Sequence, residues 1–124
     1  MTDACPGARC FELLGKKWTA HIVWALLDGP LRFTELADAA PGLRDRVLSH
    51  RLKEMMAAGV VTRSSYPEAP PRVEYALTDR GRALRPVIQA MERWGRRWVP
   101  APPAQARSAM SSARSARRTV DARM

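Results

Sequence analysis

The polar side chains of one short segment could do the chemistry of nucleic-acid recognition. Residues 43–59 read LRDRVLSHRLKEMMAAG and, at about 100° per residue, form an amphipathic helix. Its apolar face carries Leu48, Leu52 and Met55. Its opposite face carries Arg46, Ser49, His50 and Lys53. Polar and cationic side chains on such a face can hydrogen bond to base edges in the major groove of DNA, so we predict Arg46, Ser49 and His50 as base contacts.

The remaining cations of this helix are predicted to contact phosphates or base edges: Arg44, Arg51 and Lys53. Arg51 lies near the apolar edge of the helix, so it could instead pair with Glu35 or Glu54 inside the protein. For the polar face as a whole, the alternative is a surface that is merely solvated.

A predicted β-hairpin follows this helix. The runs VVTRSSY and RVEYAL alternate as strands do, and three prolines separate them (Pro67, Pro70 and Pro71). Because an isolated hairpin is only marginally stable in water, it must lean on the helices. Arg72, at the base of the loop that these prolines stiffen, is predicted to contact a phosphate or the minor groove, with Arg63 as a second candidate. A hairpin that only packs on the helices is the alternative. Under either interpretation Glu68 and Glu74 are predicted to be intramolecular partners.

Cys5 is the candidate for thiol chemistry. It precedes Pro6, which suits the first position of a helix predicted over residues 5–15, and a helix dipole there favours the thiolate. Cys10 lies about 140° around the same predicted helix, so a bridge between the two would strain it. Oxidation would therefore act between subunits or by adduct formation. A buried, inert Cys5 is the alternative.

Several more helices must position these groups. Residues 16–30 predict a helix ended by Asp28-Gly29-Pro30, and a short helix is predicted to start at Thr34 or just before it. Pro41-Gly42 forms the turn before residues 43–59, which gives a helix-turn-helix order. Thr78 is predicted to cap one last helix that Pro86 kinks. The fold class is therefore mainly α with a small β-hairpin, a winged helix-turn-helix.

The last predicted helix carries an apolar stripe: Leu84, Val87, Ile88, Met91, Trp94 and Trp98. So small a chain offers a final helix few neighbours, so this stripe is predicted to pack against a second copy in a homodimer. Ordinary core is one alternative, and a small-ligand pocket lined by tryptophans is another.

Composition limits the classes of partner. The 124 residues include 21 Lys and Arg against 12 Asp and Glu, a formal net charge of +9. This balance favours a nucleic acid first and an anionic membrane surface second. With the major-groove face of residues 43–59, the predicted partner is double-stranded DNA. The longest apolar run, Ile22 to Leu27, is far shorter than the ~20 residues of a membrane span, and no basic-then-apolar leader opens the chain. We therefore expect a cytoplasmic protein with no membrane partner.

The length fits one domain, which we place at residues 1–99. Residues 100–124 are rich in Pro, Ala, Ser and Arg and are predicted to be a basic, disordered tail. The two cysteines lack metal-ligand spacing, and no Gly-rich phosphate loop is present, so neither a metal nor a cofactor is predicted. His21 lies in an apolar run and fits a satisfied core residue better than a catalytic one. An enzyme is therefore not expected.

Four segments together resemble one known family: GKKWT, RFTEL, LSHRL and YPEAPPRVEYALT. From about Cys5 to Trp98 the chain resembles the HxlR-type winged-helix transcription regulators, relatives of the MarR group. The resemblance implies a dimeric bacterial DNA-binding regulator whose first and last helices build the dimer. It also implies a thiol sensor of oxidants or electrophiles in some members, or a small-molecule effector. Arg44 stands where the family commonly has a capping serine, which puts the operator sequence in doubt.

Two functions remain in competition on these grounds. The first is a sequence-specific regulator, most simply a repressor, that binds a pseudo-palindromic site. The second is a non-specific architectural protein that binds nucleic acid through charge alone. A charge-driven binder loses affinity steeply with salt and ignores sequence, whereas a regulator keeps a specificity ratio over random DNA.

Overall fold

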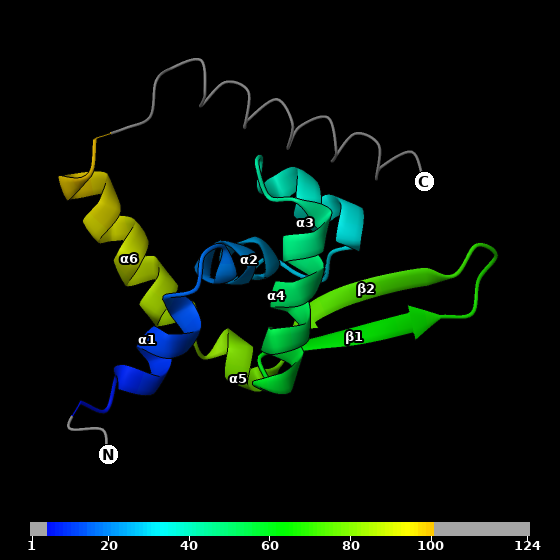
Figure 1. The fold of residues 1–124 in the computed structure, drawn as a ribbon, viewed down its shortest axis with the longest axis horizontal. Helices are drawn as coiled ribbons and strands as arrows, with labels where there is room; N and C mark the ends of the chain where they lie inside the picture. The colour runs from blue at the N-terminus through cyan, green and yellow to red at the C-terminus, as the bar shows by residue number, and fades with distance from the viewer. Residues whose placement is uncertain (1–4, 101–124) are drawn as a thin grey trace.

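The computed structural model describes residues 5–100 of the chain (Figure 1). In that range the elements follow one another as α1 (Ala8–Leu14), α2 (Thr19–Leu26), α3 (Phe33–Ala39), α4 (Asp45–Ala57), β1 (Val61–Tyr66), β2 (Arg72–Leu77), α5 (Asp79–Arg82) and α6 (Arg85–Trp98). None of these helices combines the length and the apolar character that a membrane crossing requires. Apart from Pro100, the predicted tail lies outside the described residues.

The core lies where α2, α3 and α4 meet. The predicted apolar face of α4 is confirmed, because Leu48, Leu52 and Met55 are at most 1 % exposed. From α2, Ile22 and Val23 are buried against them. Full burial of such side chains contributes about 1.5–3 kcal/mol each, so this face fixes which side of α4 points outward.

The helix-turn-helix is confirmed. Its first helix, α3, begins just before Thr34, and the backbone N–H of Arg32 donates to Glu35 Oε1 at 2.7 Å, which satisfies one free donor at the helix start. The turn at Pro41-Gly42 places Gly42 at φ +94°, a conformation that favours glycine. Arg44 then precedes the first residue of α4 and makes no side-chain cap, as arginine has no acceptor oxygen.

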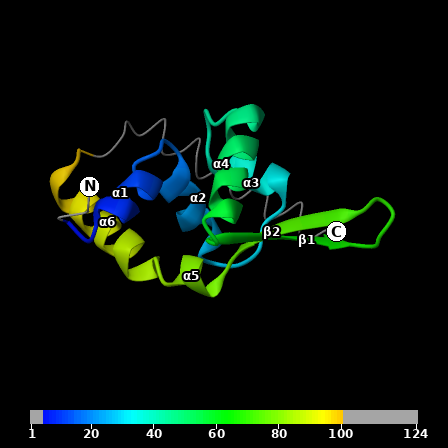
Figure 2. The same cartoon turned by 60° about the horizontal axis from the view of Figure 1, so that its bottom comes forward.

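The predicted hairpin is confirmed as a wing that projects from the helices (Figures 1 and 2). Its strands pair antiparallel from Val61 opposite Leu77 to Tyr66 opposite Arg72. One further residue joins the sheet, because Leu31 and Tyr75 exchange two backbone hydrogen bonds of 2.9 and 2.8 Å. A single paired residue has no alternation, so the sequence does not predict it. Through it the wing leans on the segment before α3.

A second junction ties the end of α4 to the end of the wing. Gly59 ends α4 at φ +75°, and the Thr78 hydroxyl donates to its carbonyl at 2.5 Å. Thr78 is the predicted N-cap, since its Oγ1 accepts from the Gly81 N–H at 3.1 Å. Gly81 is buried, and a Cβ there would lie 2.3 Å from the Val60 carbonyl oxygen. These contacts fix the position of the wing relative to α4.

We expect Gly81→Ala to lower the free energy of unfolding by about 1–3 kcal/mol, because the added methyl overlaps backbone that cannot move away cheaply. Chemical denaturation measures the change. Gly95→Ala in α6 is the matched control, because a Cβ there meets nothing within 4 Å, and alanine should leave stability equal or higher. Equal losses in both variants would contradict the close approach at Gly81.

Three helix boundaries differ from the prediction. The helix predicted over residues 16–30 begins only at Thr19, because Trp18 before it has a left-handed backbone with φ +77°. The first helix begins at Ala8 with Gly7 as its N-cap, so Pro6 is not its first residue and Cys5 lies outside it. The reason is local, because the Cys5 carbonyl accepts from the Ala8 N–H at 3.0 Å in a turn before the helix. The seven residues of α1 follow that turn.

The last predicted helix is two helices, α5 and α6. Pro86 does not kink one continuous helix but stands in the first turn of α6. Proline has no N–H to donate and its ring clashes with the carbonyl four residues earlier, here that of Arg82, the last residue of α5. The break gives α6 its own direction on the side of the molecule away from the wing (Figures 1 and 2).

Candidate nucleic-acid interface

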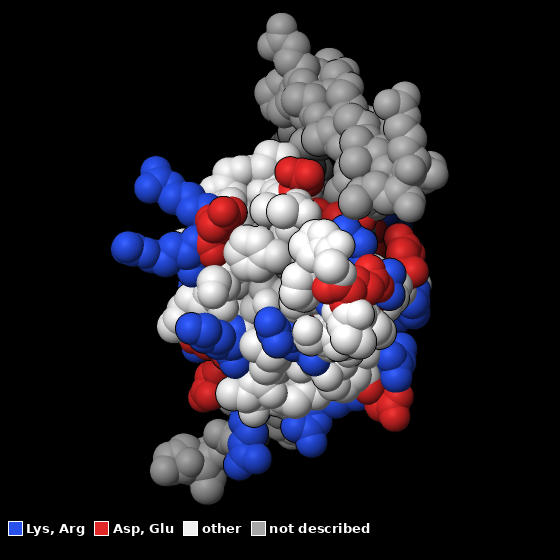
Figure 3. Space-filling model, turned by 90° about the vertical axis from the view of Figure 1, so that its right-hand side faces the viewer, with Lys and Arg blue, Asp and Glu red and all other residues white. Residues whose placement is uncertain are grey.

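The outward face of α4 carries the predicted base contacts. Arg46, His50 and Lys53 are exposed and Ser49 is half-buried. They share this face because the opposite one holds the core, so the helix presents polar groups along its solvent side. Seen from the end that carries the wing, Lys and Arg side chains surround the molecule and project past one edge, with Asp and Glu among them (Figure 3).

The Lys and Arg side chains fall into two groups, those that bind other groups of the chain and those that do not. Some are bound to backbone carbonyls, as Arg80 is to Ala58 at 2.9 Å and Arg85 to Leu27 at 2.8 Å. Others form no ion pair within residues 5–100: Arg32, Arg44, Arg46, Lys53 and Arg63. A cation without an internal counterion can bind a phosphate without first breaking an ion pair within the protein. These five lie on α4, the wing and the residues that precede α3 and α4, and three more cations without an ion pair lie elsewhere: Lys17, Arg93 and Arg97.

Arg51 differs from the other cations of α4. Its Nε donates to the Lys17 carbonyl at 2.8 Å and its Nη1 lies 3.1 Å from Glu54 Oε1, with the side chain 19 % exposed. The alternative prediction, an internal pair with Glu54, is therefore confirmed. Arg51 lies roughly 140° around the helix from Arg46. Its contact with Lys17 holds α4 against the loop between α1 and α2.

Glu54 is the centre of a small charged cluster. Its Oε2 lies 2.7 Å from Lys16 Nζ and 3.4 Å from His50 Nε2. The hydrogen bond from Lys16, more than the nearby charges of His50 and Arg51, lowers the pKa of Glu54 below its usual value. From the sequence, Glu54 is predicted as a partner of Arg51 alone. Lys16 was missed because it is predicted to start a helix over residues 16–30, whereas it lies in the loop before α2 and meets α4 only in the folded chain.

Glu54→Gln should lower the thermal midpoint at neutral pH, because the carboxylate is stabilised in the folded state. A lowered folded pKa gives stability that is complete above the ordinary glutamate pKa of about 4.3 and is lost as pH falls through the folded value. The gap between variant and wild type should therefore close in acid. Melting curves from pH 7 to pH 3 measure it, with Glu12→Gln, exposed on α1, as control. A gap independent of pH would contradict the assignment.

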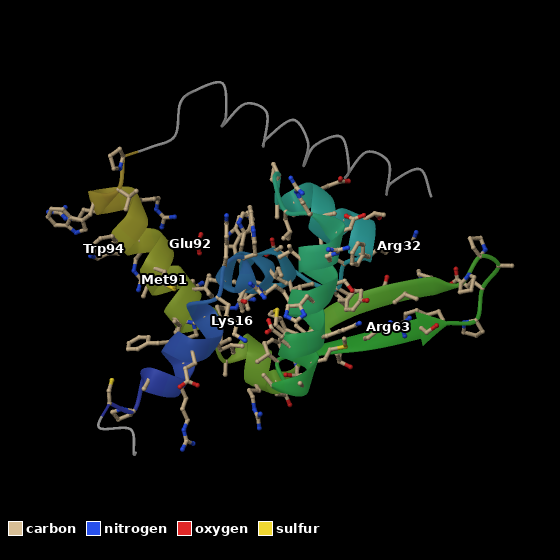
Figure 4. The ribbon with its side chains drawn as sticks, viewed as in Figure 1. Lys16, Arg32, Arg63, Met91, Glu92 and Trp94 are labelled. Carbon is tan, nitrogen blue, oxygen red and sulfur yellow. The ribbon has the colours of Figure 1, made fainter. Side chains whose placement is uncertain are left out.

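Arg72 lies folded back on the wing. Its Nη2 is 3.2 Å from Glu68 Oε2, and its guanidinium carbon lies 4.5 Å from the centre of the Tyr66 ring. The predicted internal role of Glu68 is thus present, while Arg63 on β1 is exposed (Figure 4). The structure also places Arg32 beside the wing, next to the Leu31 bridge. Sequence reasoning passed over Arg32 because only the unpredicted bridge brings it there.

The predicted apolar stripe is split between core and surface. Ile88 is 3 % exposed and belongs to the core of its own chain, and Leu84 packs against that core. Met91 is 49 % exposed and Trp94 is 62 % exposed, and Trp94 extends from α6 away from the rest of the chain (Figure 4). Val87 and Trp98 are exposed as well. α1 lies beside α6 and adds Phe11, an exposed aromatic ring that sequence analysis missed (Figures 1 and 2).

The remaining candidates are placed as follows. Cys5 is exposed at the start of the described chain, and Cys10 is half-buried on α1. His21 is a satisfied residue of the helix bundle, with Nε2 3.1 Å from the Ala39 carbonyl and its ring between Trp18 and Trp24. Between residues 5 and 100, no three His, Cys, Asp or Glu side chains are grouped so that they could hold a metal ion.

A model of the HxlR-like helix-turn-helix family matches residues 13–102. The uncharacterized HTH-type transcriptional regulator YvaP of Bacillus subtilis is 44% identical over 99 residues, which are 79% of this chain and 92% of YvaP. A MarR-family transcriptional regulator of Porphyromonas gingivalis superposes with a TM-score of 0.75 at 31% identity, covering 80% of this chain and 97% of that one. The redox regulator HypR in its oxidized form gives 0.74 at 35% identity, covering 78% and 100%.

Proposed function

Because the chain belongs to the HxlR-like helix-turn-helix family, it is a DNA-binding transcriptional regulator and not an enzyme, and we propose that it binds a pseudo-palindromic operator as a homodimeric repressor. In this proposal α4 enters the major groove of each half-site. Arg46, Ser49 and His50 contact base edges, while Arg44 and Lys53 contact phosphates. Arg51 supports α4 from within, and its contact with DNA is secondary.

One observation carries the proposal. α4 buries Leu48, Leu52 and Met55 completely and presents Arg46, His50 and Lys53 to solvent with no internal counterion for Arg46 or Lys53 among the described residues. Several arginines outside α4 are instead bound to carbonyls or carboxylates of the chain, as Arg80, Arg82 and Arg85 are. The wing and its arginines flank the same helix.

Selection of bound duplexes from a random pool tests the function. The expected result is a two-fold symmetric motif whose half-sites are centred about one helical turn, or a multiple of it, apart. The spacing follows from the symmetry of two copies joined through α6 and α1. A pool that shows no enrichment after repeated rounds in competitor DNA would instead support the charge-driven architectural protein.

The exposed Cys5 supports a further part of the proposal, a response to thiol oxidation or electrophiles. Cys5 lies three residues before the start of α1, one of the two helices proposed to form the dimer contact, and the similar structure HypR is described as a redox regulator. Adduct formation there, or a bond between subunits, would shift the two α4 helices relative to each other. A small-molecule effector at the same contact is the other form of this proposal.

Diamide is expected to release DNA from the wild type and from Cys10→Ser, but not from Cys5→Ser. The reason is accessibility, because Cys5 is exposed and Cys10 is half-buried. Fluorescence anisotropy of a labelled operator, read before and after diamide and again after dithiothreitol, measures the release. If Cys5→Ser releases DNA as the wild type does, Cys5 is not the sensor.

A further inference from the structure

A groove of about 350 Å³ lies between the start of α3 and the loop of the wing. Its walls come from two separate stretches of the chain: Arg32, Phe33, Thr34, and Glu68 to Val73. The first stretch follows the Leu31 bridge, so the paired backbone of Leu31 and Tyr75 fixes the two walls relative to each other. The groove is therefore a built feature of the junction and not a gap beside a free loop.

Arg72 brings an incompletely used guanidinium to one wall. The group offers five N–H donors, and Glu68 engages it at Nη2. The Nε atom is buried and has no hydrogen-bond partner among the described residues. A buried donor of this kind is costly to leave unpaired, and the planar guanidinium matches the oxygens of a phosphate in a two-point contact. The Tyr66 ring, 4.5 Å away, holds the group in place.

Arg32 brings a second cation to the facing wall. Its backbone N–H donates to the Glu35 carboxylate at the start of α3, and its side chain makes no cap hydrogen bond there. Its guanidinium forms no ion pair with any residue from 5 to 100, and Figure 4 shows it at the start of α3 on the side of the wing. Of the residues that line the groove, all of them described, Glu68 alone is acidic. The two arginines thus leave an excess of positive charge.

We propose that this groove seats one phosphate of the DNA backbone between Arg32 and Arg72, and that the phosphate displaces Glu68 from Arg72. The inference rests on the proposed function, since α3 and the wing flank α4 and a duplex held by α4 must pass close to both. Glu68 then acts as an internal competitor. It occupies Arg72 in the free protein, which reduces affinity for DNA of any sequence. Arg32 is a contact that adds affinity without reading bases.

Salt dependence of DNA binding tests the groove. Arg32→Gln should reduce the slope of log K against log salt concentration by about 0.9, which is about fivefold in affinity at 150 mM salt. The loss should be equal on the selected operator and on random DNA, as for any phosphate contact. Glu68→Gln should tighten binding on both, and the matched variant Glu74→Gln, on β2 but outside the groove, should not.

The outcomes separate this proposal from the proposed function. If Arg32→Gln leaves both slope and affinity unchanged while an α4 variant abolishes operator binding, the groove proposal fails and the regulator stands. If the wild type shows no operator preference, the proposed function fails first.

Free phosphate ions could bind the same two arginines as a phosphate of the DNA backbone. Inorganic phosphate, compared with chloride at equal ionic strength, tests this second source. If millimolar phosphate stabilises the wild type without DNA, and Arg32→Gln removes that effect while leaving the salt slope of DNA binding unchanged, the groove is a site for free phosphate and the assignment to the backbone is wrong. Circular dichroism melting of each variant confirms that it is folded.

Discussion

Replacing Met91 and Trp94 together with Asp is expected to convert a dimer into a monomer and to weaken operator binding by about 10²-fold or more. Both side chains are about half exposed or more in the single chain, so their substitution leaves its core intact. Two carboxylates in an apolar contact between copies would be buried without partners. A monomer then loses the gain that comes from linking two half-site contacts. Sedimentation velocity and anisotropy on the selected operator measure both effects.

Gln89→Asp combined with Arg93→Gln is the matched control, because it makes the same change in net charge on another face of α6. Both residues are exposed, and each lies two positions from Met91, roughly 200° around the helix axis. This variant should remain a dimer with a melting curve close to that of the wild type. A wild type that is monomeric at micromolar concentration would remove the basis for the α6 contact. So would a Met91 and Trp94 variant that still dimerises.

Arg46→Glu is expected to weaken binding to the operator by at least about 10²-fold at 150 mM salt. The substitution removes a base contact, which contributes about 1–3 kcal/mol of discrimination, and adds a carboxylate close to the phosphates. Arg46 is exposed on α4 and supports no neighbour through an ion pair within the described range, so the fold should be unaffected. Anisotropy on the operator and on a scrambled duplex measures the change in affinity and in specificity.

Arg93→Glu, which makes the same charge reversal on α6 away from α4 and the wing, controls for the effect of net charge. It should weaken binding only modestly and equally on both duplexes. Equal losses for Arg46→Glu and Arg93→Glu would mean that overall charge, and not the position of α4, determines affinity.

Periodicity in the sequence was sufficient for the elements that position the interface. Leu48, Leu52 and Met55 recur at helical spacing, and their burial sets the outward face of α4. Thr78 was identified as a cap because its hydroxyl is chemically suited to that position, and it does accept from Gly81. Such features depend on a few neighbours along the chain, which is why they can be predicted without tertiary information.

Features that depend on distant segments could not be predicted in this way. Arg32 reaches the wing only because Leu31 pairs with Tyr75, residues 44 positions apart in the sequence. The cluster at Glu54 joins α4 to Lys16 in the loop before α2, and no pattern in either segment indicates the other. Pro86 itself signals an interruption of the helix. Whether proline kinks a helix or separates two helices depends on how the following residues pack, and here Ile88 packs into the core.

The central claim is that α4 reads a specific DNA sequence, and one titration tests it most directly. The wild type is titrated against the selected operator and against a scrambled duplex of the same composition at 150 mM salt, with anisotropy as the readout. The account predicts a ratio of dissociation constants of about 10³ or more in favour of the operator. A ratio near one, with both affinities falling steeply with salt, would contradict it and leave a protein that binds nucleic acid by charge alone.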